Sequence, residues 1–305
     1  MIFDTLTELS RNRNVYLRSE NTLSNRIYSV CFRLACAQQG HPSRDTEEDT
    51  PQAKQARKWH KAVMDHAPYD ETTNKIYAAS VPLLQAKESI ASEREKREEW
   101  IAAEAKKLPV AHLVKQTRGL SYLYLGLVFA ETGDLNNYRS KSALWSRMGK
   151  GLKFGEIQHR TKNAEKMAEM NYDPKRNCLS RLLSENLIGG MQKGHRPFEG
   201  ERIEDRTDLS YYERLFMHRL RHEAAKDPKF YKGVTEKGKE SYTTHAANRA
   251  KRYVVKMFLR DLRNEWIRVT HDDAGEVKEL GFGNSTPAFV KKQPTRSAND
   301  LLASL

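Results

Sequence analysis

Five basic residues between positions 249 and 263 recur at spacings of 3, 4, 4 and 3: Arg249, Arg252, Lys256, Arg260 and Arg263. At about 100° per residue, these spacings place all five within roughly a quarter of a helix circumference. Apolar residues such as Val254, Phe258 and Leu262 fall on the opposite side. The pattern predicts a helix that packs on one face and offers a basic ribbon to phosphate groups on the other. The alternative is a solvated helix face whose arginines serve solubility.

A second basic zone lies between residues 141 and 166, where Gly149, Gly151 and Gly155 alternate with cations. Glycine allows a backbone to approach a phosphate closely, and Phe154 could stack on a base. The basic residues of this zone are Lys141, Arg147, Lys150, Lys153, His159, Arg160, Lys162 and Lys166. We take Lys150, Lys153, Arg160 and Lys162 as candidate nucleic-acid contacts. A flexible, charged connector is the alternative.

A glycine turn precedes this zone, and residues 117–151 read as a helix-hairpin-helix unit followed by a small helix. Gly119 lies where a tight turn with positive φ would let N–H groups reach a phosphate, with Arg118 and Ser121 beside it. Leu120, Leu123, Leu127 and Val128 supply the apolar face of the next helix. Gly133 should end that helix in a left-handed conformation. An ordinary helical hairpin is the alternative to a phosphate-binding one.

The sequence offers little support for metal binding, cofactor binding or catalysis. His218 and His222 are spaced i,i+4 and could share a metal, but no third ligand is evident, and Arg219 and Arg221 crowd the pair with positive charge. The sequence contains no P-loop, no Rossmann fingerprint and no Gly-x-Ser-x-Gly elbow. We therefore predict no catalytic residue, no metal site and no cofactor.

Four segments together resemble the coiled-coil and C-terminal part of the Piv/MooV-type (DEDD) insertion-sequence transposases. They are residues 16–31 with an Asn25-Arg26 pair, residues 80–109, the hairpin with its Gly133-Asp134 pair and Gly149, and residues 227–266 with a Lys237-Gly238-Lys239 turn. In that family a RuvC-like DEDD nuclease domain precedes a coiled coil and a serine-bearing transposase domain. The resemblance spans residues 10–268 and implies a DNA-binding helical scaffold related to transposition and DNA recombination.

The chain departs from that family at the positions that carry its chemistry. No β-rich segment with four spaced carboxylates is present, and the serine position of the family reads Gln158, His159 and Arg160. Thr161 could substitute as a nucleophile, but it is a hindered alcohol with no evident base. The hairpin carries Arg118 and Ser121 where the family usually shows proline and a second glycine. We therefore expect no strand cleavage by this chain.

The bulk composition agrees with a polyanionic partner. The chain has 53 lysines and arginines against 40 aspartates and glutamates, so its formal charge is +13. No apolar run approaches the roughly 20 residues needed to span a bilayer, and the N-terminus lacks a signal-peptide pattern. Cys31, Cys36 and Cys178 fit neither a disulfide framework nor a zinc spacing, and we expect them to be buried or half-buried. These features predict a cytoplasmic protein, associated with the nucleoid if bacterial, that has no membrane partner.

The pattern of apolar and capping residues predicts an all-α protein with almost no strands between residues 1 and 268. Helices are expected at about 21–37, around Trp59, at 72–107, at 178–187, around Leu215 and at 245–268. Asp173 and Pro174 should begin the helix at 178–187, and Gly189 should end it. The predicted domains are 1–50 (N-terminal helix and acidic linker), 51–109 (helical arm), 110–268 (transposase-C-terminal-like domain) and 269–305 (mobile tail).

The helix at 72–107 carries the strongest heptad signal, because Ile76, Leu83 and Ile90 lie seven apart, as do Ile101 and Leu108. We expect an antiparallel or dimerising coiled-coil arm and a possible homodimer through residues 72–108. A single exposed helix with many i,i+4 ion pairs is the alternative.

Three functions remain open at this stage. The first is a non-enzymatic protein that binds DNA or structured RNA through the phosphate backbone. The second is a recombination component whose nuclease domain is supplied in trans. The third is a dimeric coiled-coil adaptor whose positive charge is incidental. Backbone binding explains the two basic zones beside one hairpin most directly, and it predicts affinity that falls steeply with salt.

Overall fold

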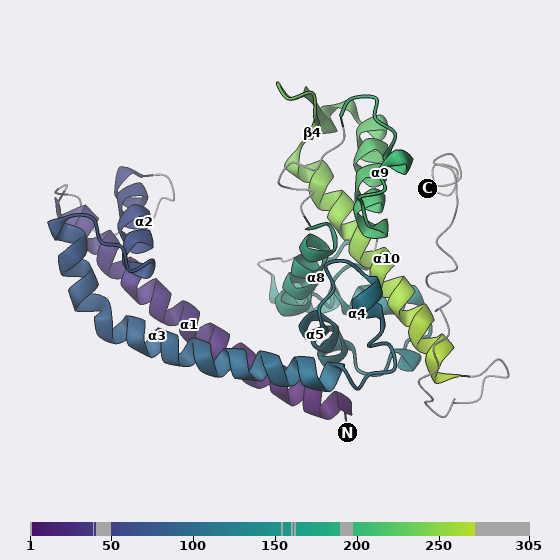
Figure 1. Ribbon diagram of the computed structural model, residues 1–305, viewed down its shortest axis with the longest axis horizontal. Helices are drawn as coiled ribbons and strands as arrows, with labels where there is room; N and C mark the ends of the chain where they lie inside the picture. The colour runs from purple at the N-terminus through teal and green to yellow at the C-terminus, as the bar shows by residue number, and fades with distance from the viewer. Residues whose placement is uncertain are drawn as a thin grey trace. The chain divides into compact units, whose positions relative to one another are not determined.

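The computed structural model describes residues 2–38, 40, 50–153, 155–159, 161, 163–189 and 198–271 (Figure 1). Helices dominate these residues, which confirms the predicted all-α class. Their strands form two short antiparallel hairpins. The chain divides into two compact units, one of residues 8–101 and one of residues 1–7 with 102–305. The domain boundaries that the sequence predicts, at 50, 109 and 268, stay predictions. The predicted acidic linker at 44–51 and tail at 269–305 lie almost wholly outside the described residues.

Two long helices form most of the unit of residues 8–101. α1 (Ile2–Gln38) and α3 (Glu71–Ala105) run antiparallel, as Figure 1 shows. Arg13 bonds to Glu98 at 2.7 Å, while Arg94 bonds to Glu20 at 2.6 Å. The predicted start of the first helix at Asn21 is wrong. No proline or glycine interrupts residues 2–38, so the helix extends to Ile2.

The third helix of this unit is α2 (Pro51–Met64), which confirms the predicted helix around Trp59. The Thr50 side chain caps its first turn and Pro51 occupies the first helical position, where a missing N–H costs nothing. Trp59 and Val63 pack into a core with Ile27 of α1 and Ile76 of α3. The α1–α3 pair is thus closed by α2 at the end of the unit that holds Ile76.

The heptad residues of α3 are used within the chain. Ile76 is buried in the core of this unit, and Leu83 packs against the same core. The helix packs against α1, so the alternative of a single exposed helix is wrong. Ion pairs at i,i+4 spacing, such as Arg97 with Glu93, are nevertheless present on its surface. Pro82 lies inside α3, and the ribbon bends in its first half (Figure 1). The homodimer through residues 72–108 stays a prediction, and burial of Ile76 does not require it.

The larger unit is built around α10 (Thr244–Thr270), which packs most extensively against α9 (Tyr211–Lys226) and α8 (Pro174–Leu187) (Figure 1). The other helical elements are α4 (Leu113–Gln116), α5 (Tyr122–Thr132), η1 (Leu135–Asn137), α6 (Lys141–Arg147), α7 (Ala164–Glu169), η3 (Ile203–Asp205) and η4 (Pro228–Phe230). Asp173 caps α8 as predicted, and Pro174 is its first residue. Gly189 follows its end with a φ of +47°.

The predicted apolar face of α10 forms the core of this unit, since Val254, Phe258 and Leu262 are all buried. The first residues of α1 belong to the same core. The Phe3 ring lies 6.0 Å from that of Phe129 and 5.9 Å from that of Trp266. The extreme N-terminus and the end of α10 therefore share one aromatic cluster.

The hairpin at Gly119 is confirmed in part. Gly119 has a φ of +84°, the Ser121 side chain caps α5, and α5 ends at Gly133. The helix before the turn is only the four-residue α4, so one arm of the expected helix-hairpin-helix is a single turn. Gly133 combines a φ of 67° with a ψ of −150°, which is not the predicted left-handed helical conformation. Glycine can adopt both the predicted and the observed backbone conformation.

The prediction that strands are nearly absent agrees with the small number of strand residues in the described chain. It did not include the two short β-hairpins. β1 (Leu152–Lys153) pairs with β2 (Glu156–Ile157), and β3 (Tyr231–Val234) pairs with β4 (Glu240–Tyr242). The second hairpin occupies part of residues 227–266, one of the four segments on which the transposase resemblance rests. Its turn contains the predicted Lys237-Gly238-Lys239 sequence, with Gly238 at a φ of +72°. Strands of two to four residues are too short to show alternation in a sequence.

Candidate nucleic-acid interface

The five cations of the predicted ribbon do lie on α10, yet they are not a solvated stripe. Arg249 is exposed, and the other four are half-buried. Arg263 donates two hydrogen bonds to the Tyr138 carbonyl, at 2.6 and 3.1 Å. Arg260 pairs with its neighbour Asp261 at 2.7 Å. Much of the ribbon therefore binds the protein itself, and the view of it as one continuous phosphate track needs correction.

Arg249 is held at the start of α10 by an acidic residue of α9. Its Nη1 bonds to Glu223 at 3.0 Å, and its Nε donates to Nε2 of His245 at 3.2 Å. The Glu223 side chain is only 2% exposed and also pairs with Arg219. Such charge-assisted bonds fix the guanidinium and offset part of its charge.

Arg252 links α10 to the second basic zone. Its Nη2 donates to the carbonyl oxygens of Lys150 and Gly151, at 2.8 and 2.7 Å. Lys150 is itself 7% exposed, and its Nζ donates to Oδ1 of Asn177 at 2.7 Å. The structure thus brings together Lys150 and Arg252, two predicted site residues from different segments.

Lys256 lies one turn beyond Arg252 and contacts an aromatic ring. Its Nζ is 4.1 Å from the centre of the Trp145 ring, and the indole N–H donates to the Lys256 carbonyl at 2.8 Å. Lys141, on the same helix as Trp145, reaches that ring at 5.9 Å. Cation–π contacts of this kind orient an ammonium group without neutralising it.

We call Lys150, Arg252 and Lys256 the cationic cluster. Among the residues that the structure describes, none of the three forms an ion pair with a carboxylate. Burial lowers the pKa of Lys150 to about 8, and the charges of Arg252 and Arg181 add to the effect. Burial, followed by repulsion from Arg252 and Arg219, also lowers the pKa of Lys256. Keeping these buried and mutually repelling groups charged costs free energy. A bound anion would offset part of that cost.

Gly119 does not offer its backbone to a ligand in the predicted way. A Cβ atom at this glycine would meet the Asn186 carbonyl oxygen at 2.0 Å, so the close approach that it permits is to the end of α8. Beside it, Arg118 donates to the Asp208 carbonyl at 3.0 Å. The Ser121 hydroxyl accepts a bond from the Tyr124 N–H, as a helix cap does. The turn is explained by packing within the unit.

The segment that corresponds to the transposase serine position has a structural role where it is described. Gln158 is 3% exposed, and its side chain accepts from the Gly151 N–H at 2.8 Å and donates to the Met170 carbonyl at 2.8 Å. The Thr161 hydroxyl accepts from the Asn163 N–H at 3.2 Å. Among the described residues, no side chain accepts a hydrogen bond from that hydroxyl as a general base would. Phe154, Arg160 and Lys162 lie outside the described residues.

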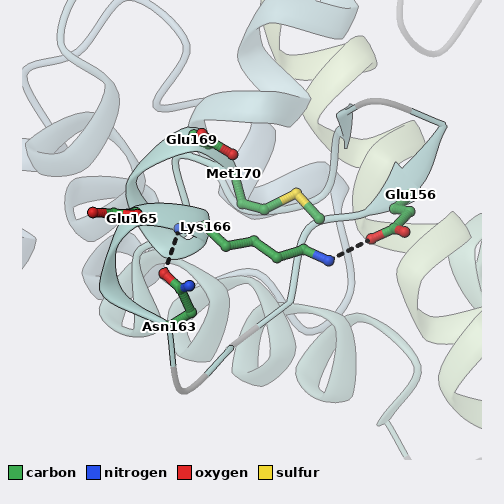
Figure 2. Close-up of a pocket in the computed structure, with 6 residues that line it drawn as sticks. All are labelled: Glu156, Asn163, Glu165, Lys166, Glu169 and Met170. Carbon is green, nitrogen blue, oxygen red and sulfur yellow. Dashed lines mark hydrogen bonds and ion pairs between the residues drawn. The ribbon is translucent and has the colours of Figure 1, made fainter.

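A cavity of about 230 Å³ lies beside this segment, but its lining is acidic. Glu156, Glu165 and Glu169 line it together with a single cation, Lys166 (Figure 2). Lys166 extends to Glu156 at 3.5 Å, while Glu165 points away from that pair in Figure 2. Lys153 lies nearby on β1, in register with Glu156. The predicted second basic zone is therefore mixed in charge, and this cavity does not suit a phosphate.

The two spaced histidines have different surroundings. Nε2 of His218 lies 3.5 Å from Glu204, and Nε2 of His222 is buried with no hydrogen-bond partner in the described structure. Burial lowers the pKa of both rings. The described residues contain no group of three or more His, Cys, Asp or Glu side chains placed to hold a metal ion.

Cysteine exposure differs from expectation at one position. Cys31 and Cys36 are buried as predicted, whereas Cys178 is exposed on α8. Burial raises the pKa of the Cys31 thiol to about 11. No described helix is long and apolar enough to cross a membrane.

Sequence reasoning missed two residues of the site, Trp145 and Asn177. The spacing of Lys141 and Trp145 by one helical turn was a usable signal, because i,i+4 neighbours share a helix face. The role of Asn177 had no local signal, since it lies 27 residues from Lys150.

Searches of protein-family models, curated proteins and solved structures return no match to this chain. The resemblance to the insertion-sequence transposases accordingly stays a prediction. The residues of the larger unit carry the functional argument without it.

Proposed function

We propose that this protein binds DNA or structured RNA through the phosphate backbone, and that its scaffold is related to the C-terminal part of an insertion-sequence transposase. The single observation that carries the binding proposal is the cationic cluster, in which three neighbouring cations have no carboxylate partner in the described residues. Phosphate is the anion that a basic protein of this kind would meet along a nucleic acid, and backbone contacts bind without reading bases.

The distribution of charge supports the same surface. Residues 8–101 hold 15 lysines and arginines against 14 aspartates and glutamates, whereas the rest of the chain holds 38 against 26. Almost the whole net charge of +13 therefore belongs to the unit that contains the cationic cluster. Long-range attraction would steer a polyanion toward this unit.

The structure decides which substitutions make a clean test. Arg252 and Arg260 are poor choices, because Arg252 holds the backbone at Lys150 and reversal of Arg260 would place a second carboxylate beside Asp261. Lys141 is exposed and Lys256 is half-buried, and neither forms an ion pair in the described residues. We therefore choose Lys141→Gln with Lys256→Gln.

The test measures the affinity for a fluorescent duplex DNA and for a structured RNA by anisotropy, at several salt concentrations. The double variant should lose about tenfold in affinity per lost contact near 0.1 M salt, and its salt slope should fall by about two in magnitude. Lys54→Gln with Lys61→Gln removes the same charge from exposed positions of α2 and serves as the control. Equal affinity of the Lys141/Lys256 variant and the parent at every salt concentration would show this surface to be wrong.

Strand cleavage is a separate question with its own assay. We expect no nicking of supercoiled plasmid with Mg²⁺ or Mn²⁺, because the serine position holds Gln158 and because the Thr161 hydroxyl serves as a turn acceptor. Nicking that disappears in Thr161→Ala would overturn this expectation.

A further inference from the structure

A second cavity, of about 420 Å³, lies where α9 ends and α10 begins. This volume falls within the range of about 300–1,000 Å³ that holds small organic ligands. Its lining includes Lys226, Lys229, Phe230, His245 and Arg249. We call it the α9–α10 pocket. It shares no residue with the cationic cluster, and the only predicted contact residue in its lining is Arg249.

Aromatic rings form one side of this pocket. Phe230 is 6% exposed, and the His245 ring lies 5.4 Å from it at an interplanar angle of 32°. The Arg249 guanidinium lies over the Phe230 ring at 5.0 Å and donates to Nε2 of His245. Because a guanidinium N–H can only donate, Nε2 of His245 is the acceptor of this bond. His245 is exposed, so it can offer a flat ring to a stacking partner.

Positive charge forms the other side. Asp227 is the only carboxylate that lines the pocket, and it pairs with Lys229 at 2.6 Å. Glu223 lies behind Arg249 and is bonded to it. Lys226 is exposed and forms no ion pair within the described residues. Three cations thus outnumber two carboxylates at this site.

The first turn of α10 adds to the positive side of the pocket. The 27-residue helix begins at Thr244, and its first turn contains no acidic residue. Thr243 and His245, which flank this start, both line the pocket. The partial positive charge at the N-terminus of a long helix favours an anion nearby. It reinforces the cations here and would not by itself make a site.

A ligand that matches both sides combines a flat ring with a strong negative charge. A nucleotide has these two parts. A terminal phosphomonoester carries about −1.5 to −2 charges at pH 7, more than the single charge of an internal phosphodiester. We propose that the α9–α10 pocket binds the terminal nucleotide of a phosphorylated nucleic-acid strand, with the base stacked on His245 and the phosphate held by Lys226 and the start of α10. This inference rests on the proposed function and names the strand end as its ligand.

The experiment compares blunt duplexes of one sequence whose ends carry a 5′-phosphate, a 3′-phosphate or hydroxyls only. The full chain should bind one phosphorylated form about tenfold more tightly than the hydroxyl form. Adenosine monophosphate should abolish that preference in competition, while adenosine and inorganic phosphate at the same concentration should not. Competition by inorganic phosphate as strong as that by the nucleotide would overturn the assignment of a nucleotide.

The variant Lys226→Ala tests the location. It should reduce the preference for a phosphorylated end to less than twofold and leave the affinity for hydroxyl ends unchanged, because Lys226 is exposed and its loss should not disturb folding. Lys232→Ala, an exposed lysine on β3, is the control and should keep the preference. A Lys226→Ala variant that keeps the full preference would overturn the pocket as its source.

The failures of the two proposals are distinguishable. Equal affinity of the parent protein for phosphorylated and hydroxyl ends would overturn this inference and leave backbone binding standing. Failure to bind any of the duplexes at low salt would overturn both.

Discussion

Gly119 has the positive φ that a tight turn requires, but its bare α-carbon faces the backbone of α8. A Cβ atom there would lie 2.0 Å from the Asn186 carbonyl oxygen. Gly133, at the other end of α5, also has a positive φ, yet a Cβ atom on it would meet nothing within 4 Å. Substitution of Gly133 therefore measures the cost of the backbone conformation alone, whereas substitution of Gly119 adds the cost of a steric clash.

The comparison gives a direct prediction. Gly133→Ala should lower the free energy of unfolding by about 1–2 kcal/mol, because its backbone lies in a region of positive φ that is nearly restricted to glycine. Gly119→Ala should cost about 3 kcal/mol or more, because the backbone of α8 must also shift. Urea denaturation of both variants and the parent measures the difference. Equal losses for the two variants would contradict the packing of Gly119 on Asn186.

Lys150 predicts a pH dependence of stability. Its pKa falls from the ordinary 10.5 to about 8 in the folded protein, chiefly because of burial. Between pH 8 and 10.5 the unfolded chain therefore binds more protons at this site than the folded chain does. Stability contributed by this group must rise with pH across that window, by up to about 3 kcal/mol.

The variant Lys150→Met isolates this effect, because methionine fills similar space and does not titrate. The difference in unfolding free energy between parent and variant should shift in favour of the parent as the pH rises from 8 to 10.5. Urea denaturation at several pH values within that window measures it. Parallel pH profiles for the two proteins would show that Lys150 is not held in the described way.

The candidate site could be predicted only in part, because its residues have remote contact partners. The spacing of the α10 cations correctly placed them on one helix face, because a helix repeat is local. Their partners are remote. Arg252 meets carbonyls more than 100 positions away, and Arg263 meets the Tyr138 carbonyl 125 positions away. No local pattern reports such contacts, so half-buried structural arginines and ligand-binding arginines look alike in a sequence.

At the scale of elements, α1 and α3 are joined by a line of partly buried ion pairs. Arg94 bonds to Glu20 of α1 and to Glu98 of its own helix, and Glu98 also bonds to Arg13. These four side chains are 11–19% exposed. Removal of this arginine would take one ion pair from Glu20 and leave Glu98 with Arg13.

We expect Arg94→Ala to lower the free energy of unfolding by about 2–3 kcal/mol, since it breaks a partly buried network and deprives Glu20 of this ion pair. Arg11→Ala, an exposed arginine on α1, should change it by less than about 0.5 kcal/mol. Thermal or urea unfolding followed by circular dichroism measures both. A loss for Arg94→Ala no larger than that for Arg11→Ala would show that the network does not join the helices.

Elements were predictable where capping residues or a clear apolar period marked them. The helices α3, α8 and α10 begin and end within a few residues of their predicted positions, because periodicity and caps such as Asp173 mark them. The start of α1 was missed, since its first twenty residues lack a clear apolar stripe. The hairpins β1–β2 and β3–β4 contain too few residues for a two-residue period to appear.

On the scale of the whole molecule, charge separates the two units. Residues 8–101 are nearly neutral, and the remaining residues carry the excess of lysine and arginine. Lysine acetylation measured by mass spectrometry, with and without duplex DNA, should therefore show protection of Lys141 and Lys256. Lys54 and Lys61 of α2 should be modified at unchanged rates. Equal protection of all four lysines would show that the near-neutral unit also binds the duplex.

The aromatic cluster of Phe3, Phe129 and Trp266 also constrains biosynthesis. Phe3 is synthesised 263 residues before its partner Trp266. At about 5–20 residues per second, roughly 10–50 s separate the two. The unit of residues 8–101 is complete long before that, so it can fold while the seven residues ahead of it wait without their core. Final closure of the larger unit therefore waits until Trp266 has been made, and it requires the N-terminal turn of α1 to dock onto a core that is synthesised much later.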